Sequence, residues 1–253
     1  MGKKFTDFSF GIVFGLSISP LPSFALNLNK TIRENPNYPQ STFTLERAGY
    51  VVSYDGRTRG ASWVYERLTP ESVSKEETNR DGFRFKEDED LPGFLRATNA
   101  DYRGSGYDRG HLCPAGDCNG SREAMQSSFL LSNVSPQVAS LNRGAWREIE
   151  IQVRELARAG KTVHVYTLPL FLASEVEGKR EVRYPVIGEN NISVPTHFAK
   201  VAITEGEDPP LAYILPNKKI ESGNLDQSRT TIEKVERAAG MVFPRINSPS
   251  QGS

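Results

Sequence analysis

The chain has 253 residues with 31 basic and 31 acidic side chains, so its formal net charge is zero. With 37% hydrophobic and 25% charged residues, its composition excludes a disordered chain and a multi-span membrane protein. A zero net charge also excludes binding of a polyanion through overall charge alone, although it leaves room for a locally basic site. The length and the lack of internal repeats predict one main globular domain, residues 43–245.

Residues 1–25 have the pattern of a secretory signal peptide. Lys3 and Lys4 precede the apolar run Phe8–Ile18, and the small residues Ser23 and Ala25 fit a cleavage site. The apolar run is too short to cross a bilayer of about 30 Å as a helix. We expect an exported, periplasmic or secreted protein with no membrane segment in its mature form. Two alternatives remain: a buried N-terminal helix, and a mitochondrial presequence, although presequences are usually rich in arginine and poor in acidic residues.

Residues 26–42 are expected to form an irregular N-terminal arm, because Pro36 and Pro39 interrupt regular structure. Two runs rich in β-forming residues follow, Tyr50–Tyr54 and Ala61–Arg67. The polar segment between them predicts a hairpin that carries Arg57 on its turn. From the local sequence alone, Arg57 is a solvent-facing loop charge.

The next segment, Lys75–Asp90, is highly charged and is expected to be a surface excursion without visible chemistry. Phe94–Ala97 is predicted to start a strand that leads into a glycine-rich run. In that run, a histidine, two arginines and three glycines occur within the nine residues that end at His111. Such a stretch offers little to a hydrophobic core.

The end of this run, Asp108-Arg109-Gly110-His111, is interpreted as a functional site. Histidine exchanges a proton near neutral pH, and arginine offers a planar fork of donors to a phosphate. Glycine lets the backbone approach a ligand closely. Cys113 and Cys118, the only cysteines, follow directly, either as free thiols or as a disulfide. A zinc site is disfavoured because a fourth ligand at recognisable spacing is missing.

Further on, Ser121–Gln126 reads as a short capped helix and Phe129–Val134 as a strand. The clearest helix is Asn142–Ala159, with apolar residues at helical spacing and Gly160 as its end. Along it, polar or aromatic residues recur every four positions at Asn142, Trp146, Glu150 and Arg154. Asn142 and Glu150 are therefore expected to face the same region. The plainer interpretation is a surface ion pair between Glu150 and Arg154.

The remaining sequence is expected to form scaffold. Strands are predicted at Thr162–Thr167, Arg183–Ile187, Val194–Thr204 and Leu211–Leu215, followed by an amphipathic helix at Arg229–Ala239 and a flexible tail at 246–253. His164 is read as a packed strand histidine, and no catalytic role is assigned to His197.

Several ordered motifs resemble one family. They are Ala97-Thr98-Asn99-Ala100-Asp101-Tyr102, Asp108-Arg109-Gly110-His111, Leu131-Ser132-Asn133-Val134-Ser135-Pro136-Gln137, Leu141-Asn142 and Trp146. Together they resemble the DNA/RNA non-specific endonucleases, and within them the endonuclease G branch. The resemblance runs from about Tyr50 to Pro244 and includes Arg57-Thr58-Arg59-Gly60. It departs from that branch after His111, where the branch is rich in alanine and this chain has its two cysteines.

The resemblance implies an α+β protein with the ββα-metal (His-Me finger) nuclease fold, in which helices flank a mainly antiparallel central sheet. It implies a magnesium-dependent endonuclease that cuts single- and double-stranded DNA and RNA without sequence preference and leaves 5′-phosphate ends. Mn²⁺ is expected to substitute for Mg²⁺, and a homodimer is expected.

The same resemblance assigns roles to individual residues. His111 would be the general base and Asn142 the direct metal ligand, while Glu150 would contact the waters of the metal. Arg57, Arg109 and Arg154 would bind phosphate, and Asp108 would orient its loop. The alternative is a catalytically inactive nucleic-acid-binding protein. A small-molecule phosphodiesterase is disfavoured because the histidine and aspartate cluster of a two-metal site is missing.

Overall fold

The structure, a computed structural model, describes residues 41–74, 78, 80–206, 208–220, 225–244 and 246. The predicted signal peptide at 1–25, nearly all of the arm at 26–42 and the tail beyond Ile246 lie outside these residues. Within the described part of the chain, no helix is long and apolar enough to cross a membrane.

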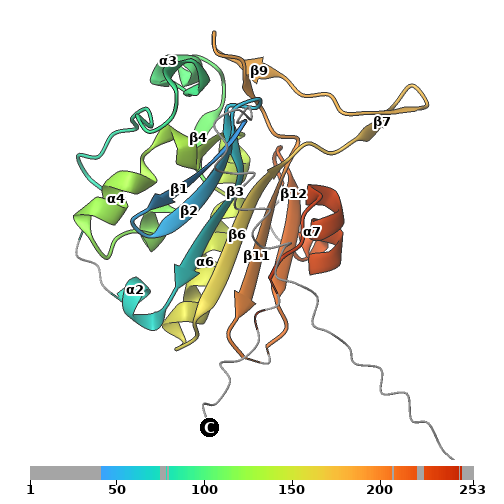
Figure 1. The fold of residues 1–253 in the computed structure, drawn as a ribbon. Coiled ribbons are helices and arrows are strands. Elements are labelled where there is room, and N and C mark those ends of the chain that lie inside the picture. Colours follow the sequence, from blue (N-terminus) through green and yellow to red (C-terminus); the bar gives the residue numbers. More distant parts are fainter. Residues whose placement is uncertain are drawn as a thin grey trace, which may run out of the picture. The chain divides into compact units, whose positions relative to one another are not determined.

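The central element is a six-stranded sheet with the order β1-β2-β3-β6-β11-β12, in which every neighbouring pair is antiparallel (Figure 1). The strands are β1 Thr42–Arg47, β2 Tyr50–Asp55, β3 Gly60–Leu68, β6 Val163–Leu170, β11 His197–Thr204 and β12 Leu211–Pro216. The predicted hairpin at residues 55–60 is confirmed as the β2–β3 turn. Strand β1 was not predicted, because its alternation of Phe43 and Leu45 with polar residues covers only six positions.

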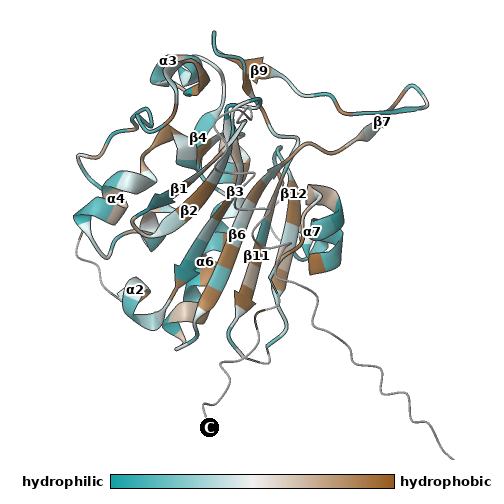
Figure 2. Ribbon diagram, viewed as in Figure 1, coloured by the Kyte–Doolittle hydropathy of each residue, from teal (hydrophilic) through white to brown (hydrophobic). Residues whose placement is uncertain are grey.

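Two helices cover opposite faces of this sheet. On one face, helix α6, Ala145–Arg158, packs Trp146, Ile149 and Val153 against buried residues such as Val165 and Phe198. On the other face, Val235 of helix α7, Ile232–Ala239, packs in a cluster with Leu168, Ala199 and Val201. Successive residues of a strand face opposite sides of a sheet, so strands covered on both faces need hydrophobic residues in runs. Strands β6 and β11 carry such runs (Figure 2).

Beside the main sheet lies a smaller unit that carries the Asp108–His111 motif. Strand β4, Asp108–His111, pairs antiparallel with β5, Val134–Gln137, so that His111 lies opposite Val134. Helices α5, Ala139–Asn142, and α6 follow β5 directly. Two strands followed by a helix form the expected ββα arrangement, and the α+β fold class is confirmed.

The expected single helix Asn142–Ala159 is wrong at its start. Asn142 ends the short helix α5, and Gly144, with φ −110° and ψ −115°, separates it from α6. A Cβ at Gly144 would lie 2.6 Å from the carbonyl oxygen of Ser140, so glycine permits this close turn. Asn142 and Glu150 therefore lie on two different helices.

Smaller elements complete the described chain. They are α2 Pro70–Ser74, η1 Gly93–Leu95, α3 Asn99–Tyr102, η2 Ala115–Asp117, α4 Arg122–Ser128, η3 Leu131–Asn133, β7 Ser174–Val176, β8 Lys179–Glu181, β9 Val186–Ile187, β10 Ile192–Ser193 and η4 Leu225–Ser228. The capped helix near Ser121 is confirmed, because the Ser121 side chain accepts a hydrogen bond from the backbone N–H of Ala124. The helix that ends at Gly240 is also confirmed, with that glycine at φ 67°.

Three strand predictions are wrong in whole or in part. Phe94–Ala97 contains a 3₁₀ turn after Pro92 instead of a strand. Phe129–Val134 contains the turn η3, and the strand β5 begins only at Val134. Of the predicted strand at 183–187, only Val186–Ile187 pairs with another strand. Pro185 directly before it lacks a backbone N–H, so it cannot donate a hydrogen bond to a neighbouring strand.

Candidate active site

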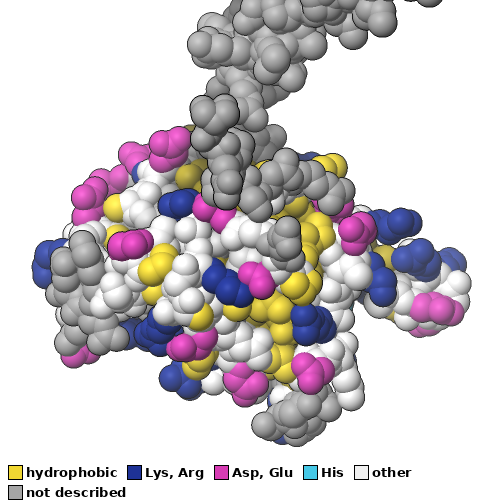
Figure 3. All heavy atoms as spheres, turned by 90° about the horizontal axis from the view of Figure 1, so that it is seen from below, with side chains coloured by type: hydrophobic (Ala, Val, Ile, Leu, Met, Phe, Trp, Pro, Cys, Tyr) yellow, Lys and Arg dark blue, Asp and Glu magenta, His cyan; other side chains and the backbone are white. Residues whose placement is uncertain are grey.

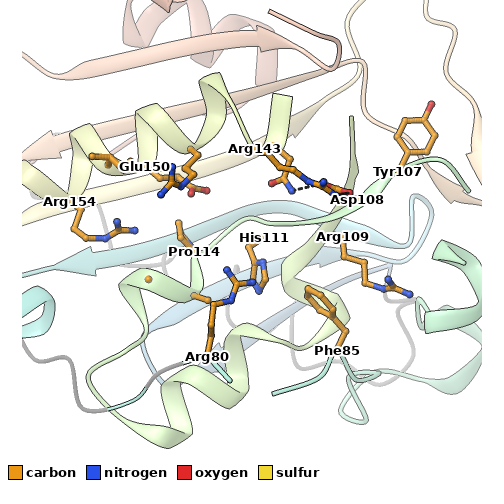
Figure 4. Close-up of a pocket in the computed structure, with 15 residues that line it drawn as sticks. Arg80, Phe85, Tyr107, Asp108, Arg109, His111, Pro114, Arg143, Glu150 and Arg154 are labelled. Atoms are coloured by element: carbon orange, nitrogen blue, oxygen red, sulfur yellow. Dashed lines mark hydrogen bonds and ion pairs between the residues drawn. The ribbon is translucent and has the colours of Figure 1, made fainter. Parts of the chain in front are cut away.

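A pocket of about 610 Å³ opens beside β4 and α6 and collects most of the predicted site residues (Figure 4). It is lined by Arg80, Phe85, Tyr107, Asp108, Arg109, His111, Pro114, Ala115, Gly116, Asn142, Arg143, Arg147, Glu150, Ile151 and Arg154. His111, Arg109, Asn142, Glu150 and Arg154 are thus brought together from strand β4 and two helices.

The charge of this pocket differs from that of the chain. Five arginines and only two carboxylates line it, although the net charge of the whole chain is zero. On the face of the molecule in Figure 3, by contrast, basic and acidic side chains are interspersed. A concave, locally basic surface attracts anions such as phosphate groups.

Asp108 fixes the orientation of the Asn142 side chain. Its Oδ2 atom accepts a hydrogen bond of 3.0 Å from Asn142 Nδ2, and Arg143 donates two more, of 2.7 and 2.8 Å, to the same carboxylate. Partial burial acts to raise the pKa of Asp108, but these hydrogen bonds outweigh it and lower the pKa below its ordinary value. An ionised carboxylate only accepts hydrogen bonds, so the amide nitrogen of Asn142 must face Asp108 and its oxygen Oδ1 must face away.

The donor set of the pocket fits a hydrated magnesium ion. Asn142 offers an amide oxygen that no described residue occupies with a hydrogen bond, and the Glu150 carboxylate lies in the same pocket. Mg²⁺ prefers oxygen ligands and usually keeps several waters. Among the described residues, no group of three or more histidine, cysteine, aspartate or glutamate side chains could hold a metal. The residues therefore suit an ion held by one or two oxygens and its own waters, and do not suit a cage of protein ligands.

His111 is half-buried at the end of β4, and Asn133 holds the backbone that follows it. The carbonyl of Asn133 accepts from the N–H of Leu112 at 2.9 Å, and its side chain makes two hydrogen bonds of 2.9 Å with the backbone of Cys113. Burial lowers the pKa of His111 to about 4, and the positive charge of Arg80 adds to this effect. The imidazole is therefore neutral at physiological pH and can accept a proton.

Glu150 and Arg154 line the pocket from α6 with different partners. The pKa of Glu150 is raised to about 7, because burial and the charge of Asp117 outweigh the opposing charges of Lys200, Arg154 and Arg147. Arg154 is paired with the buried Asp117 and not with Glu150. The surface ion pair considered from the sequence is therefore wrong, because Asp117 on the turn after His111 takes the guanidinium.

Arg109 lies against two aromatic rings in the wall of the pocket. Its guanidinium lies 5.7 Å from the ring centre of Phe85 and 5.4 Å from that of Tyr102, and it donates to the carbonyl of Asn99 at 3.1 Å. Cation–π contacts with two rings and the hydrogen bond to Asn99 restrict the position of the guanidinium. The remaining N–H groups can therefore meet an anion in the pocket without further ordering of the side chain.

Arg57 is the one predicted site residue that the structure does not bring to this pocket. Its side chain is 83% exposed on the β2–β3 turn, 3.5 Å from the carboxylate of Asp55. It lines a separate pocket with Phe171, Tyr184 and Met241. Arg57 was expected at the site because it belongs to a motif shared with the family. The β2–β3 turn that carries it lies at a different pocket from β4 and α6.

The lining residues without a role assigned from the sequence include Arg80, Phe85, Arg143 and Arg147. The segment Lys75–Asp90 was expected to be a surface excursion without visible chemistry, and two of its described residues, Arg80 and Phe85, line the pocket. Phe85 packs 5.1 Å from His111, and the Arg80 guanidinium lies 6.0 Å from the ring of Phe129. Phe83 and Phe85, the two phenylalanines of this otherwise polar segment, could have indicated from the sequence that part of it packs against the core.

Gly110 is required between the two functional residues of β4. A Cβ at this position would overlap the side-chain amide oxygen of the buried Gln137 and would lie 2.8 Å from its Cβ. We expect Gly110→Ala to lower the free energy of unfolding by about 1–3 kcal/mol, the usual cost of overpacking. Urea unfolding measures this. Gly60→Ala is the matched control, because no atom lies within 4 Å of a Cβ there and its φ is not in the left-handed region. Equal stability of the two variants would contradict the prediction.

Cys113 and Cys118 are free thiols with their sulfur atoms 3.3 Å apart. Both are buried, and the thiol of Cys113 donates to the carboxylate of Glu66 at 3.1 Å. Burial raises the pKa of Cys113, and Cys118 and Glu66 raise it further.

Burial keeps a reagent away from both thiols, and at Cys113 the raised pKa also lowers the share of the thiolate, which is the nucleophile. Both cysteines should therefore resist a thiol-alkylating reagent in the native protein and react fully after denaturation. Mass spectrometry of the alkylated protein gives the answer, and rapid native labelling of either thiol would contradict it.

Comparison with known proteins agrees with this geometry. A sequence model of the DNA/RNA non-specific endonucleases matches residues 28–246. Mitochondrial endonuclease G of Bos taurus is 47% identical over 202 residues, which cover 78% of this chain and 67% of the relative. Nuclease C1 of Cunninghamella echinulata var. echinulata is 44% identical over 206 residues, which cover 79% of this chain and 81% of the relative. The solved structure of the EndoG/EndoGI complex contains a chain with a TM-score of 0.77 and 38% identity, covering 89% of this chain and 93% of that one. The protein therefore belongs to the DNA/RNA non-specific endonuclease family.

Proposed function

We propose that this endonuclease is magnesium-dependent, that it hydrolyses phosphodiester bonds in single- and double-stranded DNA and RNA, and that it leaves 5′-phosphate ends. One observation carries the proposal: a neutral histidine, an oriented amide oxygen and a half-buried carboxylate line one pocket together with five arginines. Hydrolysis of a phosphodiester needs a base for water, positive charge for the phosphate and fixed positions for both.

In the proposed mechanism, His111 accepts a proton from water. The water oxygen then bonds to phosphorus while the bond from phosphorus to the 3′ oxygen breaks, so the phosphate remains on the 5′ side. The leaving 3′ oxygen takes up a proton from solvent and becomes a hydroxyl. The imidazolium formed at His111 returns its proton to solvent, because burial and Arg80 disfavour its charge. A Mg²⁺ ion, or Mn²⁺ in its place, would add positive charge that stabilises the phosphorane and the leaving oxygen.

Asn142 and Glu150 are proposed to hold the ion. Asn142 would do so directly through Oδ1, which the hydrogen bond from Nδ2 to Asp108 turns away from the carboxylate. Glu150 would hydrogen-bond the waters of the ion. Asp108 would then orient the ligand through its hydrogen bond with Nδ2 of Asn142 and would not contact the metal.

The arginines of the pocket are proposed to bind the phosphate and its neighbours along the strand. Arg109 and Arg154 have fixed side chains, while Arg80 and Arg147 are exposed and have no carboxylate partner among the described residues. Contacts to phosphate carry no sequence information, so a pocket of this kind predicts cleavage of many sequences. Arg57, which lies outside the pocket, is proposed only as a contact to a more distant phosphate.

The experiment that tests this proposal is digestion of plasmid DNA and of RNA by the purified protein with Mg²⁺, with Mn²⁺ and with a chelator. We expect cleavage of both substrates with either ion, no cleavage with the chelator, and 5′-phosphate ends that a ligase accepts. Binding of both substrates without cleavage under any of these conditions would favour the catalytically inactive binding protein instead.

The cellular compartment and the oligomeric state of the protein are proposed from the N-terminal sequence and from the relatives. Residues 1–25 favour export, whereas the endonuclease G relatives of Bos taurus and Homo sapiens are mitochondrial proteins by name, which favours the mitochondrial alternative. A homodimer is proposed from the resemblance to endonuclease G. Light scattering of the purified protein measures its mass in solution.

We expect the mature protein to have lost its first 25 residues, because they resemble a cleaved targeting segment. N-terminal sequencing of protein recovered from its native compartment measures the start of the chain. A start near Leu26 fits export, and an intact Met1 would contradict a cleaved segment of either kind.

A further inference from the structure

His111 differs from the other two histidines of the chain because no described residue forms a hydrogen bond with its side chain. His164 contacts the Tyr65 hydroxyl at 2.9 Å and Glu205 at 3.0 Å, and His197 contacts the Thr196 hydroxyl at 3.0 Å. By contrast, the Nε2 atom of His111 is buried and no described residue forms a hydrogen bond with it. Catalytic histidines are usually oriented by a carboxylate or carbonyl on the second ring nitrogen. Here that group is missing from the described residues.

Two phenylalanine rings take its place around the imidazole. The Phe129 ring lies 5.0 Å from the imidazole at an interplanar angle of 87°, and the Phe85 ring lies 5.1 Å away at 45°. We call Phe85 and Phe129 the aromatic clamp. Its two rings also pack on each other at 5.1 Å, and Phe83 stacks on Phe129 at 5.9 Å. Phe129 is buried, so its ring has little freedom to move.

The clamp is suited to a neutral imidazole. Edge-to-face contact at this distance is the favoured geometry between aromatic rings, and a ring face can accept an N–H weakly. The charged groups around the imidazole do not offset this preference. Arg80 and Arg109 lie beside the rings of the clamp, and Asp108, Glu150 and Arg154 line the pocket, while no described carboxylate hydrogen-bonds to His111. The surroundings therefore offer an imidazolium no direct partner.

We propose that Phe85 and Phe129 are positioning residues that hold neutral His111 with its N–H at Nε2 inside the aromatic clamp and the lone pair of Nδ1 towards the pocket. The proposal rests on the base role proposed for His111 and adds how that base is oriented and which nitrogen accepts the proton. Nδ1 is the ring nitrogen left for this, because Nε2 is buried. Water would give its proton to Nδ1, and the lack of a partner for the imidazolium would return that proton to solvent before the next turnover.

Nuclear magnetic resonance of the metal-free protein labelled with ¹⁵N-histidine tests the proposal without any assay of activity. The chain has only three histidines, so each resonance can be assigned with single variants. In the wild type we expect His111 as the Nε2–H tautomer and neutral down to about pH 5, since burial and Arg80 disfavour its charge. A mixture of tautomers in the wild type would overturn the proposal.

Phe129→Leu removes the ring and keeps a hydrophobic side chain. We expect the pKa of His111 to rise by about one unit or more and the tautomer preference to weaken. We also expect kcat to fall by about tenfold with little change in KM, because the base is less well aligned. Phe83→Leu is the matched control, since Phe83 packs on Phe129 and forms no ring contact with His111. It should leave the tautomer and the titration unchanged.

Variants of Phe85 give a second, independent test. Phe85 is only half-buried, so its variants are expected to fold even if Phe129→Leu does not. Phe85→Leu should weaken the tautomer preference, and Phe85→Tyr, which keeps the ring, should restore it. If neither leucine variant changes the tautomer or the titration of His111, the clamp has no positioning role. These readouts stay valid if His111 proves not to be the base, so failure of the clamp and failure of the mechanism are distinguishable.

Discussion

Replacing His111 with alanine is expected to lower the rate of plasmid cleavage by about 10²–10⁴-fold, the usual contribution of a general base. The two charged residues beside it in β4, Asp108 and Arg109, cannot take over the proton. Asp108 is ionised, but its hydrogen bonds from Arg143 and Asn142 lower its pKa and so make it a weaker base. The guanidinium of Arg109 has only hydrogen-bond donors and no acceptor for a proton. The variant should still bind nucleic acid, because the arginines of the pocket are unchanged.

The measurement is the initial rate of cleavage with Mg²⁺, together with affinity for a short DNA duplex in the presence of a chelator. His164→Ala is the matched control, since His164 lies in β6 with Tyr65 and Glu205 as partners, outside the pocket. It should retain nearly full activity. If His111→Ala, free of contaminating nuclease, cuts plasmid at close to the wild-type rate, the proposed mechanism is wrong.

The ββα unit shows how much of the site can be predicted from sequence. The Asp108–His111 motif, the strand before Asn142 and the following helix occur in family order, and the structure places them around one pocket. Hydrophobic periodicity also predicted the face of α6 that packs on the sheet, with Ile149 and Val153 buried. These features depend on residues that are close in the chain, where local spacing determines which side chains meet.

The parts that sequence did not predict depend on contacts between distant segments. Arg154 pairs with Asp117, 37 residues earlier, and not with Glu150 four residues earlier. Phe85 reaches His111 from a segment whose composition resembles a solvent-exposed loop. The break at Gly144 was hidden because a glycine near the start of an apolar helical pattern is compatible with an unbroken helix. In each case tertiary packing determined the outcome, and the local pattern of a single sequence does not specify contacts between distant segments.

The net charge of the chain does not show how its charges are distributed over the surface. A chain with equal numbers of basic and acidic residues places five arginines and only two carboxylates around one pocket, while other acids, such as Asp88 and Asp90, pair with Arg47 elsewhere. An arginine that pairs with a carboxylate adds less to the potential of a surface than one that stays unpaired. The polyanion-binding capacity of this protein therefore depends on the pairing pattern, which only the three-dimensional structure gives.

Asn142→Ala should abolish most magnesium-dependent activity while leaving folding nearly intact, because Asn142 ends a short helix at the pocket and fills no part of the core. Loss of a direct ligand should weaken apparent Mg²⁺ affinity more than the roughly 10–100-fold typical of residues that act through a ligand. Glu150→Ala, which would lose only contacts to the waters of the ion, is expected to stay within that smaller range.

Asp108 accepts hydrogen bonds from both Asn142 and Arg143, so variants of Asp108 and Arg143 test whether the orientation of Asn142 matters. Asp108→Ala removes the acceptor that fixes the Asn142 amide, so it should also weaken apparent Mg²⁺ affinity, although less than Asn142→Ala. Arg143→Ala is the matched control, since it removes the other partner of Asp108 and leaves the hydrogen bond to Asn142 in place. Rates measured over a Mg²⁺ titration, with circular dichroism to verify folding, rank the four variants. If Asn142→Ala has the apparent metal affinity and the maximal rate of the wild type, Asn142 is not the ligand. The oriented amide oxygen would then need another explanation.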